Sequence, residues 1–321
     1  MSRHRFFLSV NLLVLALIVI AVMSLAIGNK TYALTNLLGN DIVTQIRLPR
    51  LLATLFVGIL LSASGLMMQS MTQNPIAELS TLGISSGSSF ALAILLGLGF
   101  GTSSLISLLA GALGAGLAFV LVVVLTARSR FNPLKTLLVG MSLSMIFTSL
   151  ASSISFYTKN TQTYFMWLVG SFSGVTREKV WFMALVTLIF LAVIGVFGKQ
   201  IKILGFGQEL ATSLGVNVAG VRTLMMILVV LASSIVVSSV GVISFVGLIT
   251  PHIAKRLVRN DAHFGQIFIL SSLLGMCLLS LSDFLARVIF MPYEFPVGAI
   301  TMLLGAPFFL YLVRTTSGGG K

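Results

Sequence analysis

Residues Leu51 to Met71 read LLATLFVGILLSASGLMMQSM, and none of these 21 side chains carries a charge. About 20 helical residues cross the roughly 30 Å hydrocarbon core of a bilayer, so this stretch alone predicts a membrane-spanning helix. Phe6–Ile27 and Ser104–Ala127 are equally free of charge. Several such runs in one chain indicate a helical protein that crosses the membrane many times.

The composition of the whole chain agrees with this prediction. Hydrophobic residues make up 57% of the 321 residues and charged residues only 8%, and the mean hydropathy is +1.09. An ordinary soluble domain carries far more charge. The net charge of +13 would suit a nucleic-acid partner, but the basic residues lie in short loops beside apolar runs. That placement is typical of orientation in a membrane, and we expect no nucleic acid to bind.

Apolar runs and the breaks between them predict an all-α polytopic membrane protein with one domain over residues 1–321. The first run is longer than the roughly 7–15-residue core of a secretory signal, so we take it as a span. The stretch 222–258 is divided into two spans because Gly241 and Gly247 interrupt it. We expect about ten spans, at residues 6–27, 51–71, 82–99, 104–127, 134–157, 180–198, 222–242, 244–258, 264–285 and 296–313.

The distribution of basic residues predicts how the chain is oriented. Ten spans place both ends of the chain on the same side of the membrane. When the loops are assigned alternately to the two sides, that side collects 13 of the 20 Lys and Arg residues and the other side collects seven. Because positive charge accumulates on the cytoplasmic side, both termini are predicted to be cytoplasmic.

Between the sixth and seventh predicted spans, residues Gly205 to Arg222 read GFGQELATSLGVNVAGVR, a polar stretch on the cytoplasmic side. Helical spacing places Leu210 and Leu214 on one face of a short helix, and Gly215 can adopt the left-handed conformation that ends it. Asn217 can cap a second short helix over residues 218–221. Two interpretations stay open: an ordinary loop between spans, or a knob that docks on a cytoplasmic partner.

A transporter that works against a gradient needs an energy source, and this chain lacks the usual ones. It contains no G-x-x-x-x-G-K-[ST] phosphate-binding loop. Ion-coupled carriers usually bury several carboxylates, whereas only Asp283 lies clearly within a predicted span. We therefore predict that the chain is not itself an enzyme and that an ATPase on another subunit drives it.

Neither a cofactor nor a metal site is expected. Cys277 is the single cysteine and lies within an apolar run, so it can form neither an internal disulfide nor a cysteine cluster. The three histidines, His4, His252 and His263, show no metal-ligand spacing.

Several motifs in order along the chain resemble those of the permeases of iron-siderophore, haem and cobalamin ABC importers, the FecCD family. Any one of these motifs would be a weak signal, but together they extend from Arg47 to about Leu312 and are highly specific. They are RLPR at 47–50, QNPIAE at 73–78, LGISSG at 82–87, SLGV at 213–216, FVGLITPHIA at 245–254 and GAP at 305–307.

This resemblance implies a type II importer in a bacterial cytoplasmic membrane. Such an importer has two ten-helix permease subunits, identical or different, a cytoplasmic ABC ATPase dimer and an extracytoplasmic substrate-binding protein. Residues 205–221 would be the coupling helices that seat in the ATPase. The residues expected to make this contact are Gln208, Glu209, Leu210, Ser213, Leu214 and Gly215.

The expected cargo is a ferric siderophore, moved by alternating access. Haem and cobalamin remain alternatives because the same family carries them. An ion-coupled secondary transporter and a channel-like or purely structural membrane protein are less favoured classes. Uptake that follows an ion gradient would indicate the first of these two, and the absence of a partner ATPase on mild purification would indicate the second.

Arg47 and Arg50 lie on the predicted outer side, against the positive-inside trend. Snorkelling to lipid headgroups is one explanation. The resemblance implies another, in which Arg47, Arg50 and Arg287 pair with acidic residues of the binding protein. Asp283 and Arg287 are four residues apart on one predicted helix, so they can also pair with each other. That pairing would dilute the docking role of Arg287.

Two further features bear on the transport path. Met67, Met68 and Met71 are candidates for lining it, with ordinary gap filling by methionine as the alternative. Residues 163–173 read TYFMWLVGSFS, which is too short to cross the membrane. We expect a re-entrant or interfacial helix there, with Tyr164 and Trp167 at headgroup level. The resemblance implies that this helix is associated with a gate.

Overall fold

The computed structural model describes residues 2–28, 31–33, 39–72, 74–78, 83–100, 104–127, 133–258, 264–289, 291 and 293–317. Gln73 and Leu82, which begin two of the motifs, and His263 lie outside these ranges. All regular structure within them is helical. The elements are α1 (Ser2–Ala26), η2 (Val43–Arg47), α2 (Leu48–Thr72), α3 (Ile84–Gly97), α4 (Ser104–Ala127), α5 (Pro133–Tyr157), α6 (Thr161–Val169), α7 (Arg177–Leu204), α8 (Gln208–Ser213), α9 (Val218–Val240), α10 (Val246–Leu257), α11 (Phe264–Val288) and α12 (Val297–Ser317).

A helix occupies the position of each predicted span. Within the described residues, seven helical segments are long and apolar enough to cross a membrane. α3 and the segment Val297–Leu312 of α12 are apolar but shorter. At the position of the remaining predicted span lies α10, which has 12 residues and contains Pro251. The all-α polytopic fold is therefore confirmed, whereas ten complete crossings stay a prediction.

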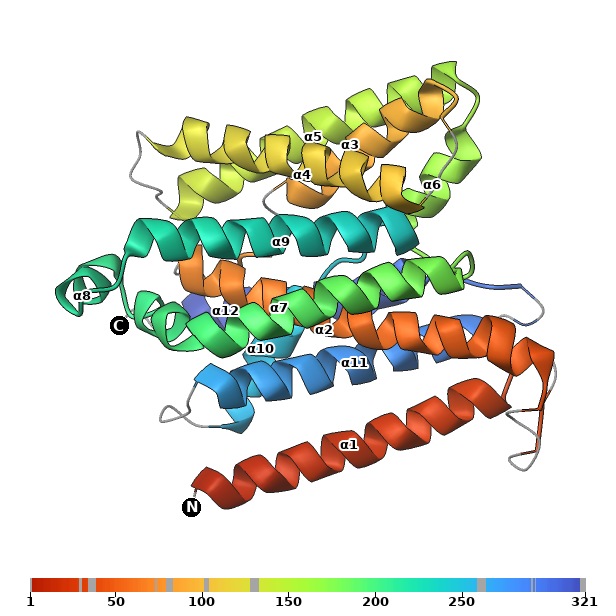
Figure 1. Cartoon of the computed structure of the whole chain (residues 1–321), viewed down its shortest axis with the longest axis horizontal. Helices are drawn as coiled ribbons and strands as arrows, with labels where there is room; N and C mark the ends of the chain where they lie inside the picture. Colours follow the sequence, from red (N-terminus) through yellow and green to blue (C-terminus); the bar gives the residue numbers. More distant parts are fainter. Residues whose placement is uncertain are drawn as a thin grey trace.

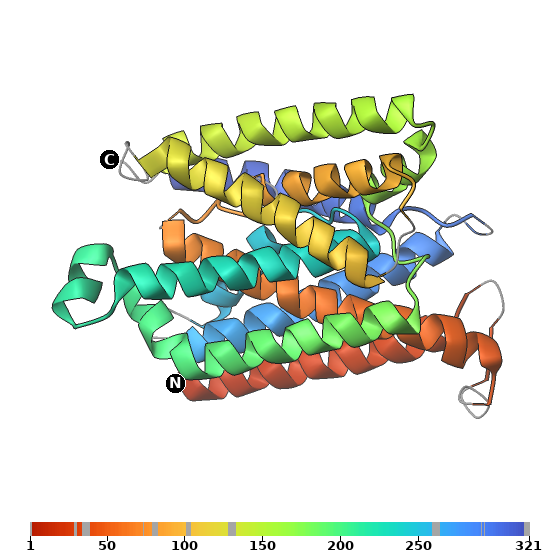
Figure 2. The same cartoon turned by 45° about the horizontal axis from the view of Figure 1, so that its top comes forward.

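The long helices run side by side, with α2 at the centre (Figure 1). α2 contacts α7, α9, α10 and α11, and α1 packs on α11. α9 contacts α3 and α4 as well as α2 and α7, so it separates the group formed by α3, α4 and α5 from the rest of the molecule (Figures 1 and 2).

Glycines let α2 approach its neighbours closely. A Cβ atom added at Gly58 would lie 2.7 Å from the backbone of Gly275 in α11, and one added at Gly65 would overlap the backbone of Gly247 in α10. In a membrane, small residues at a helix crossing let the backbones pack together, because lipid supplies little hydrophobic drive for association. These glycines therefore hold α2, α10 and α11 as one tightly packed block.

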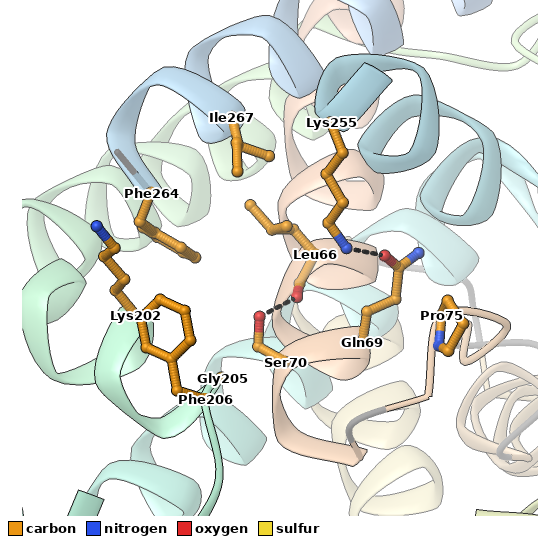
Figure 3. A pocket seen from close by; sticks show the side chains of 10 residues that line it. All are labelled: Leu66, Gln69, Ser70, Pro75, Lys202, Gly205, Phe206, Lys255, Phe264 and Ile267. Carbon is orange, nitrogen blue, oxygen red and sulfur yellow. Dashed lines mark hydrogen bonds between the residues drawn. The ribbon is translucent and has the colours of Figure 1, made fainter. Parts of the chain in front are cut away.

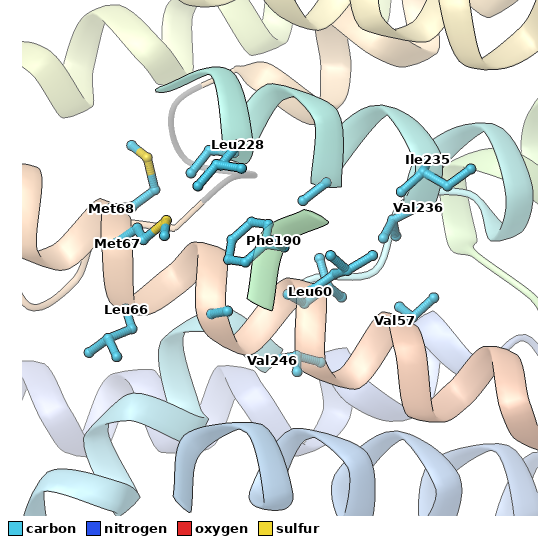
Figure 4. Close-up of a cluster of buried hydrophobic side chains, with 14 of the residues drawn as sticks. Val57, Leu60, Leu66, Met67, Met68, Phe190, Leu228, Ile235, Val236 and Val246 are labelled. Carbon is cyan, nitrogen blue, oxygen red and sulfur yellow. The ribbon is translucent and has the colours of Figure 1, made fainter. Parts of the chain in front are cut away.

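Large apolar side chains fill the interior around α2. Met67 and Met68 are fully buried in the core, together with Phe190 of α7 and Leu228 of α9, as Figure 4 shows. Met71 is partly buried against the same core. In this conformation Met67 and Met68 thus fill gaps between helices. That the three methionines line the transport path stays a prediction, and it would apply to another conformation of the protein.

The chain leaves helical geometry between α9 and α10. Gly241 and Phe245 have positive φ angles of 83° and 70°. α10 then begins inside the protein, where residues 246–251 are all buried. The stretch predicted as two spans is therefore one long helix followed by a short helix that starts in the interior.

Candidate functional site

The stretch predicted to meet a cytoplasmic partner projects from one end of the molecule. Both views show α8 beyond the neighbouring ends of α7 and α9, at the end where α1 begins and α12 finishes (Figures 1 and 2). We refer to residues 205–217 as the α8 knob. The knob contacts the rest of the described chain mainly through α7 and α9.

Local signals in the sequence shape this knob. Gly215 has a φ of 77°, and the N–H of Val216 donates to the carbonyl of Ala211 at 3.0 Å, which ends α8. The side chain of Asn217 accepts from the N–H of Gly220 at 3.0 Å and caps the next helix. The predicted turn and cap are confirmed.

One part of the prediction for this stretch was wrong. Residues 218–221 do not form a second short helix; they are the first turn of α9, which continues without a break to Val240. The cap at Asn217 starts a helix that passes directly from the polar stretch into the apolar run. Arg222 therefore lies within a helix and does not mark its beginning.

The surface of the α8 knob is apolar and exposed. Phe206, Leu210 and Leu214 are 66%, 47% and 59% exposed, while Ala211 alone in α8 is buried against the body. Large apolar side chains gathered on an exposed element mark an interaction surface. Sequence reasoning missed Phe206, although an aromatic residue between two glycines was a usable signal.

The polar residues expected at this contact are also accessible. Gln208, Glu209 and Ser213 are all exposed, and the hydroxyl of Ser213 donates to the carbonyl of Leu210 at 2.9 Å. They lie in the same short stretch of chain as the exposed apolar side chains of the knob. An apolar centre with a polar rim is the usual arrangement of a protein–protein contact.

The opposite end of the molecule carries a buried cluster of charges. Asp283 of α11 is only 1% exposed, and each of its carboxylate oxygens faces an arginine. Arg50 Nε lies 2.8 Å from one oxygen and Arg287 Nε lies 3.2 Å from the other. The predicted pairing of Asp283 with Arg287 is confirmed.

Other partners complete this cluster. Arg50 Nη1 lies 2.8 Å from the carboxylate of Glu294, which is 47% exposed. Arg287 donates to the hydroxyl of Ser24 at 2.5 Å and to its carbonyl at 3.2 Å, which ties α11 to the end of α1. We refer to Arg50, Asp283, Arg287 and Glu294 as the outer charge cluster, because they lie at the end of the molecule that the sequence predicts to face outward.

Arg47 lies near this cluster and is also directed inward. Its Nη1 donates to the carbonyl of Leu25 at 2.7 Å, and its guanidinium lies 5.1 Å from the ring centre of Tyr32. Arg47, Arg50 and Arg287 are all buried. Their docking role stays a prediction, with an added condition: an acidic receptor side chain would have to compete with their internal partners.

Sequence reasoning missed Ser24 and Glu294 in this cluster. The usable signal for Glu294 was its rarity, since the chain has only seven acidic residues. The partners of Arg50 are 233 and 244 positions away along the chain. A single sequence carries no signal for contacts of that separation.

The short helix expected near residues 163–173 is present as α6, which is nine residues long. Backbone hydrogen bonds join it to the break between α9 and α10, because the N–H of Val242 donates to the carbonyl of Trp167 at 2.8 Å. The N–H of Gly298, at the start of α12, donates to Gly170 at 3.2 Å. Tyr164 is buried against α5 instead of facing outward. α6 therefore connects three elements at this end.

In the part of the chain that the structure describes, no three His, Cys, Asp or Glu side chains are placed to hold a metal. Cys277 is a partly buried free thiol in α11.

The overall fold matches a solved transporter along almost its full length. A structure described as an inward-facing conformation of a metal-chelate type ABC transporter superposes with a TM-score of 0.84 at 29% identity. The match covers 95% of this chain and 98% of the other. The class defined by this architecture is thus the permease of an ABC transporter.

The sequence comparison identifies the family. The family model of the FecCD transport family matches residues 12–315, and the chain belongs to this family. The permease protein FhuB of the iron(3+)-hydroxamate import system of Bacillus subtilis is 36% identical over 277 residues, 86% of this chain and 72% of that protein. The permease protein YfmD of the Fe(3+)-citrate import system of the same species is 35% identical over 275 residues, 85% of this chain and 81% of that protein.

Proposed function

We propose that this chain is the transmembrane permease subunit of an ATP-driven importer that carries a ferric siderophore across the cytoplasmic membrane of a bacterium by alternating access. The α8 knob carries this proposal, because it offers an apolar surface that is exposed within the part of the chain that the structure describes. In a chain without a phosphate-binding loop, such a surface suits a separate ATPase. The relatives named for hydroxamate and citrate import both handle ferric chelates, which favours a cargo of this class.

In this proposal the α8 knob carries force from the ATPase to the helices. Phe206, Leu210 and Leu214 would fill an apolar groove of the ATPase, with Gln208, Glu209 and Ser213 at its rim. Because the knob is joined directly to α7 and α9, its displacement would tilt both helices. α9 in turn contacts α2, α3 and α4, so the movement would spread through the core.

At the other end, we assign the gate to α6 and its backbone contacts. Opening there would require the bonds between Trp167 and Val242 and between Gly170 and Gly298 to break or slide. Cysteines at Trp167 and Val242, cross-linked by oxidation in a Cys277→Ser background, should stop uptake. Reduction should restore it, and uptake that continues at full rate with the cross-link formed would refute the assignment.

Two further partners follow from the proposed machinery. A substrate-binding protein would dock at the end that carries the outer charge cluster, with Arg47, Arg50 and Arg287 as the expected cationic contacts. Complementary charge there would govern orientation and encounter rate more than raw affinity. A second permease subunit, identical or different, would complete the path on the other side of the cargo.

The decisive experiment is transport by the reconstituted complex. The chain is purified mildly with its associated proteins and placed in liposomes, and uptake of radioactive ferric hydroxamate is measured with ATP and with an ion gradient. We expect uptake only with ATP and competition by other ferric siderophores. Competition by haem or cobalamin instead would show that the cargo is of that class. Uptake with an ion gradient alone would show that the protein is a secondary transporter.

The state of Asp283 weighs against the ion-coupled alternative. This carboxylate is the one acidic group that lies clearly within a predicted span, and two arginines already occupy both of its oxygens. A coupling ion would have to displace a guanidinium to reach it. The break between α9 and α10 does resemble the discontinuous helices of secondary transporters, which is why the reconstitution includes the ion-gradient arm.

A further inference from the structure

Two adjoining cavities lie near the root of the α8 knob. The first has a volume of about 430 Å³ and lies among the ends of α2, α7 and α10 and the start of α11 (Figure 3). The second has a volume of about 460 Å³ and lies between α7 and α11. Both are lined by Lys202 and Phe264, so the two spaces are neighbours.

The first cavity carries positive charge. Lys255 and Lys202 lie on opposite sides of it (Figure 3). The ammonium group of Lys255 donates to the amide oxygen of Gln69 at 2.8 Å, and that of Lys202 lies 6.0 Å from the ring centre of Phe206. Within the described ranges, neither lysine has a carboxylate within 4 Å. The cavity is therefore suited to an anionic group.

Apart from Lys199 and Lys202, the second cavity is lined by apolar side chains and by glycines around which there is room. A Cβ atom added at Gly195 or Gly265 would meet nothing within 4 Å, and one added at Gly198 would meet only the ring of Phe264 at 3.8 Å. Glycines that let helices approach closely behave differently, as Gly58 shows with a clash at 2.7 Å. The glycines between α7 and α11 thus leave a groove open on the outer surface of the helix bundle.

A cationic head space joined to an apolar groove matches the chemistry of one class of ligand. We propose that the two cavities bind one anionic phospholipid, with its phosphate between Lys199, Lys202 and Lys255 and an acyl chain along the glycine-lined groove. Lys199 and Lys202 both line the groove, so the charge and the apolar surface are continuous. Basic pockets between helices on the cytoplasmic side suit anionic headgroups.

The position of this site gives it a consequence for transport. Gly205 and Phe206, the first residues of the α8 knob, line the first cavity. A bound headgroup would therefore fix the angle at which the knob leaves α7. On the proposed function, ATP-driven uptake would then depend on anionic lipid, whereas lipid binding itself can be measured on the permease alone.

The first test measures lipid retention by the full chain in detergent with native mass spectrometry. Phosphatidylglycerol, phosphatidylcholine and inorganic phosphate are offered separately, and retention of phosphatidylglycerol alone is expected. The double variant Lys199→Gln/Lys202→Gln should weaken that retention roughly 25-fold, at about a factor of five for each lysine near the headgroup. Lys135→Gln is the control, because Lys135 is exposed on α5 and lines neither cavity. Equal losses in the double variant and the control would overturn the proposal.

A second test leaves the charges in place. Gly195→Leu places a side chain in the groove at a position where an added Cβ atom meets nothing within 4 Å. The fold should tolerate it, while phosphatidylglycerol retention falls on the order of tenfold. Gly116→Leu is the matched control, because Gly116 on α4 also has open space around it and lies outside both cavities. If wild type and Gly195→Leu bind inorganic phosphate equally well and neither retains lipid, the site is a phosphate site and the proposal is wrong.

A second copy of this chain is the competing occupant of the groove. A single cysteine placed at Leu191, which lines the groove, in a Cys277→Ser background reports on it. Ready formation of disulfide-linked dimers would show that the groove meets another subunit and would overturn the proposal. Failure to cross-link, together with labelling by a lipid-borne thiol reagent, would support it.

Discussion

The two ends of the molecule differ in what they expose and what they bury: one exposes apolar side chains, and the other buries charged ones. The α8 knob holds Phe206, Leu210 and Leu214 in the open, with few side-chain bonds to the body. The outer charge cluster buries Asp283 between Arg50 and Arg287 and leaves only the carboxylate of Glu294 substantially exposed among its members.

This difference indicates that the α8 knob is a binding surface, whereas the side chains of the outer charge cluster hold helices together. Apolar surface that a partner covers contributes roughly 25 cal/mol for each Å² removed from water, so covering the knob would favour association. A buried ion pair already has its partners, and an incoming charge gains little by replacing one of them. The knob is thus the stronger candidate for a permanent partner, and the outer end for a transient one.

Removing the carboxylate of Asp283 from the outer charge cluster should have the largest effect, and this effect should be on the free energy of unfolding. Asp283→Ala removes the carboxylate that both buried arginines face and leaves Arg50 with the half-exposed Glu294 as its remaining ion-pair partner. Loss of one partner of a buried pair costs about 3–5 kcal/mol. The free energy of unfolding in detergent should fall by that amount, and α11 should loosen from α2 and α1. Asp41→Ala is the control, because Asp41 is exposed at the same end; equal stability of the two variants would mean that the cluster does not hold the helices.

The next largest effect is expected from a substitution in the α8 knob, and it should lower the affinity for the ATPase. Leu214→Glu places a charge on the exposed apolar surface of the knob, and loss of an important contact residue costs about 2 kcal/mol or more of binding free energy. ATPase affinity should fall roughly thirtyfold, and ATP hydrolysis should uncouple from uptake, while thermal stability stays unchanged.

Thr212→Glu controls for the added charge in this experiment, because Thr212 is also exposed on α8. Its hydroxyl donates only to the carbonyl of Gln208 within its own helix. We expect its effect on ATPase binding to be several times smaller. Normal uptake by Leu214→Glu would remove the knob from the coupling path.

The sequence predicts the features that depend on neighbouring residues. Long apolar runs predict the long helices, the four-residue spacing predicts the pairing of Asp283 with Arg287, and the types of Gly215 and Asn217 predict a turn and a cap. Each of these depends on atoms within about one helical turn, where intrinsic preferences and side-chain spacing decide the outcome.

Features that arise from packing between distant segments could not be predicted in the same way. One partner of Arg50, Asp283, is on α11, and one partner of Arg287, Ser24, is on α1. Only the folded bundle brings these helices together. Burial of Met67 and Met68 likewise depends on Phe190 and Leu228. A single sequence does not specify which helix faces are in contact.

A smaller effect on ATPase binding is expected from a substitution that changes only the backbone conformation of the knob. Gly215→Val forces a β-branched residue into the left-handed region, which costs about 1–2 kcal/mol, while its Cβ meets no atom within 4 Å. The strain should appear as a displaced α8 and reduced ATPase binding, with little change in global unfolding. Gly215→Asn should behave almost as wild type because asparagine tolerates this conformation; equal losses for both variants would mean that the backbone angle is not what matters.

The smallest effect on stability is expected for Glu294→Gln, and it is the most informative about the outer end. Glu294 is half exposed and Arg50 keeps its bond to Asp283, so stability should fall by no more than about 1 kcal/mol. If a receptor carboxylate approaches Arg50, Glu294 is its internal competitor. Removing that charge should therefore speed association with the binding protein, measured by stopped-flow fluorescence at low salt.

Charge reversal at Arg50 itself would be a poor substitute for this measurement, because it also destroys the buried pair with Asp283. Glu294→Gln changes the competition and leaves that pair intact. Faster association that disappears at high salt would place Arg50 in the receptor contact, since exposed charges act through screened fields. Unchanged or slower association would mean that Arg50 serves the fold alone, and receptor recognition would then have to lie elsewhere on this end.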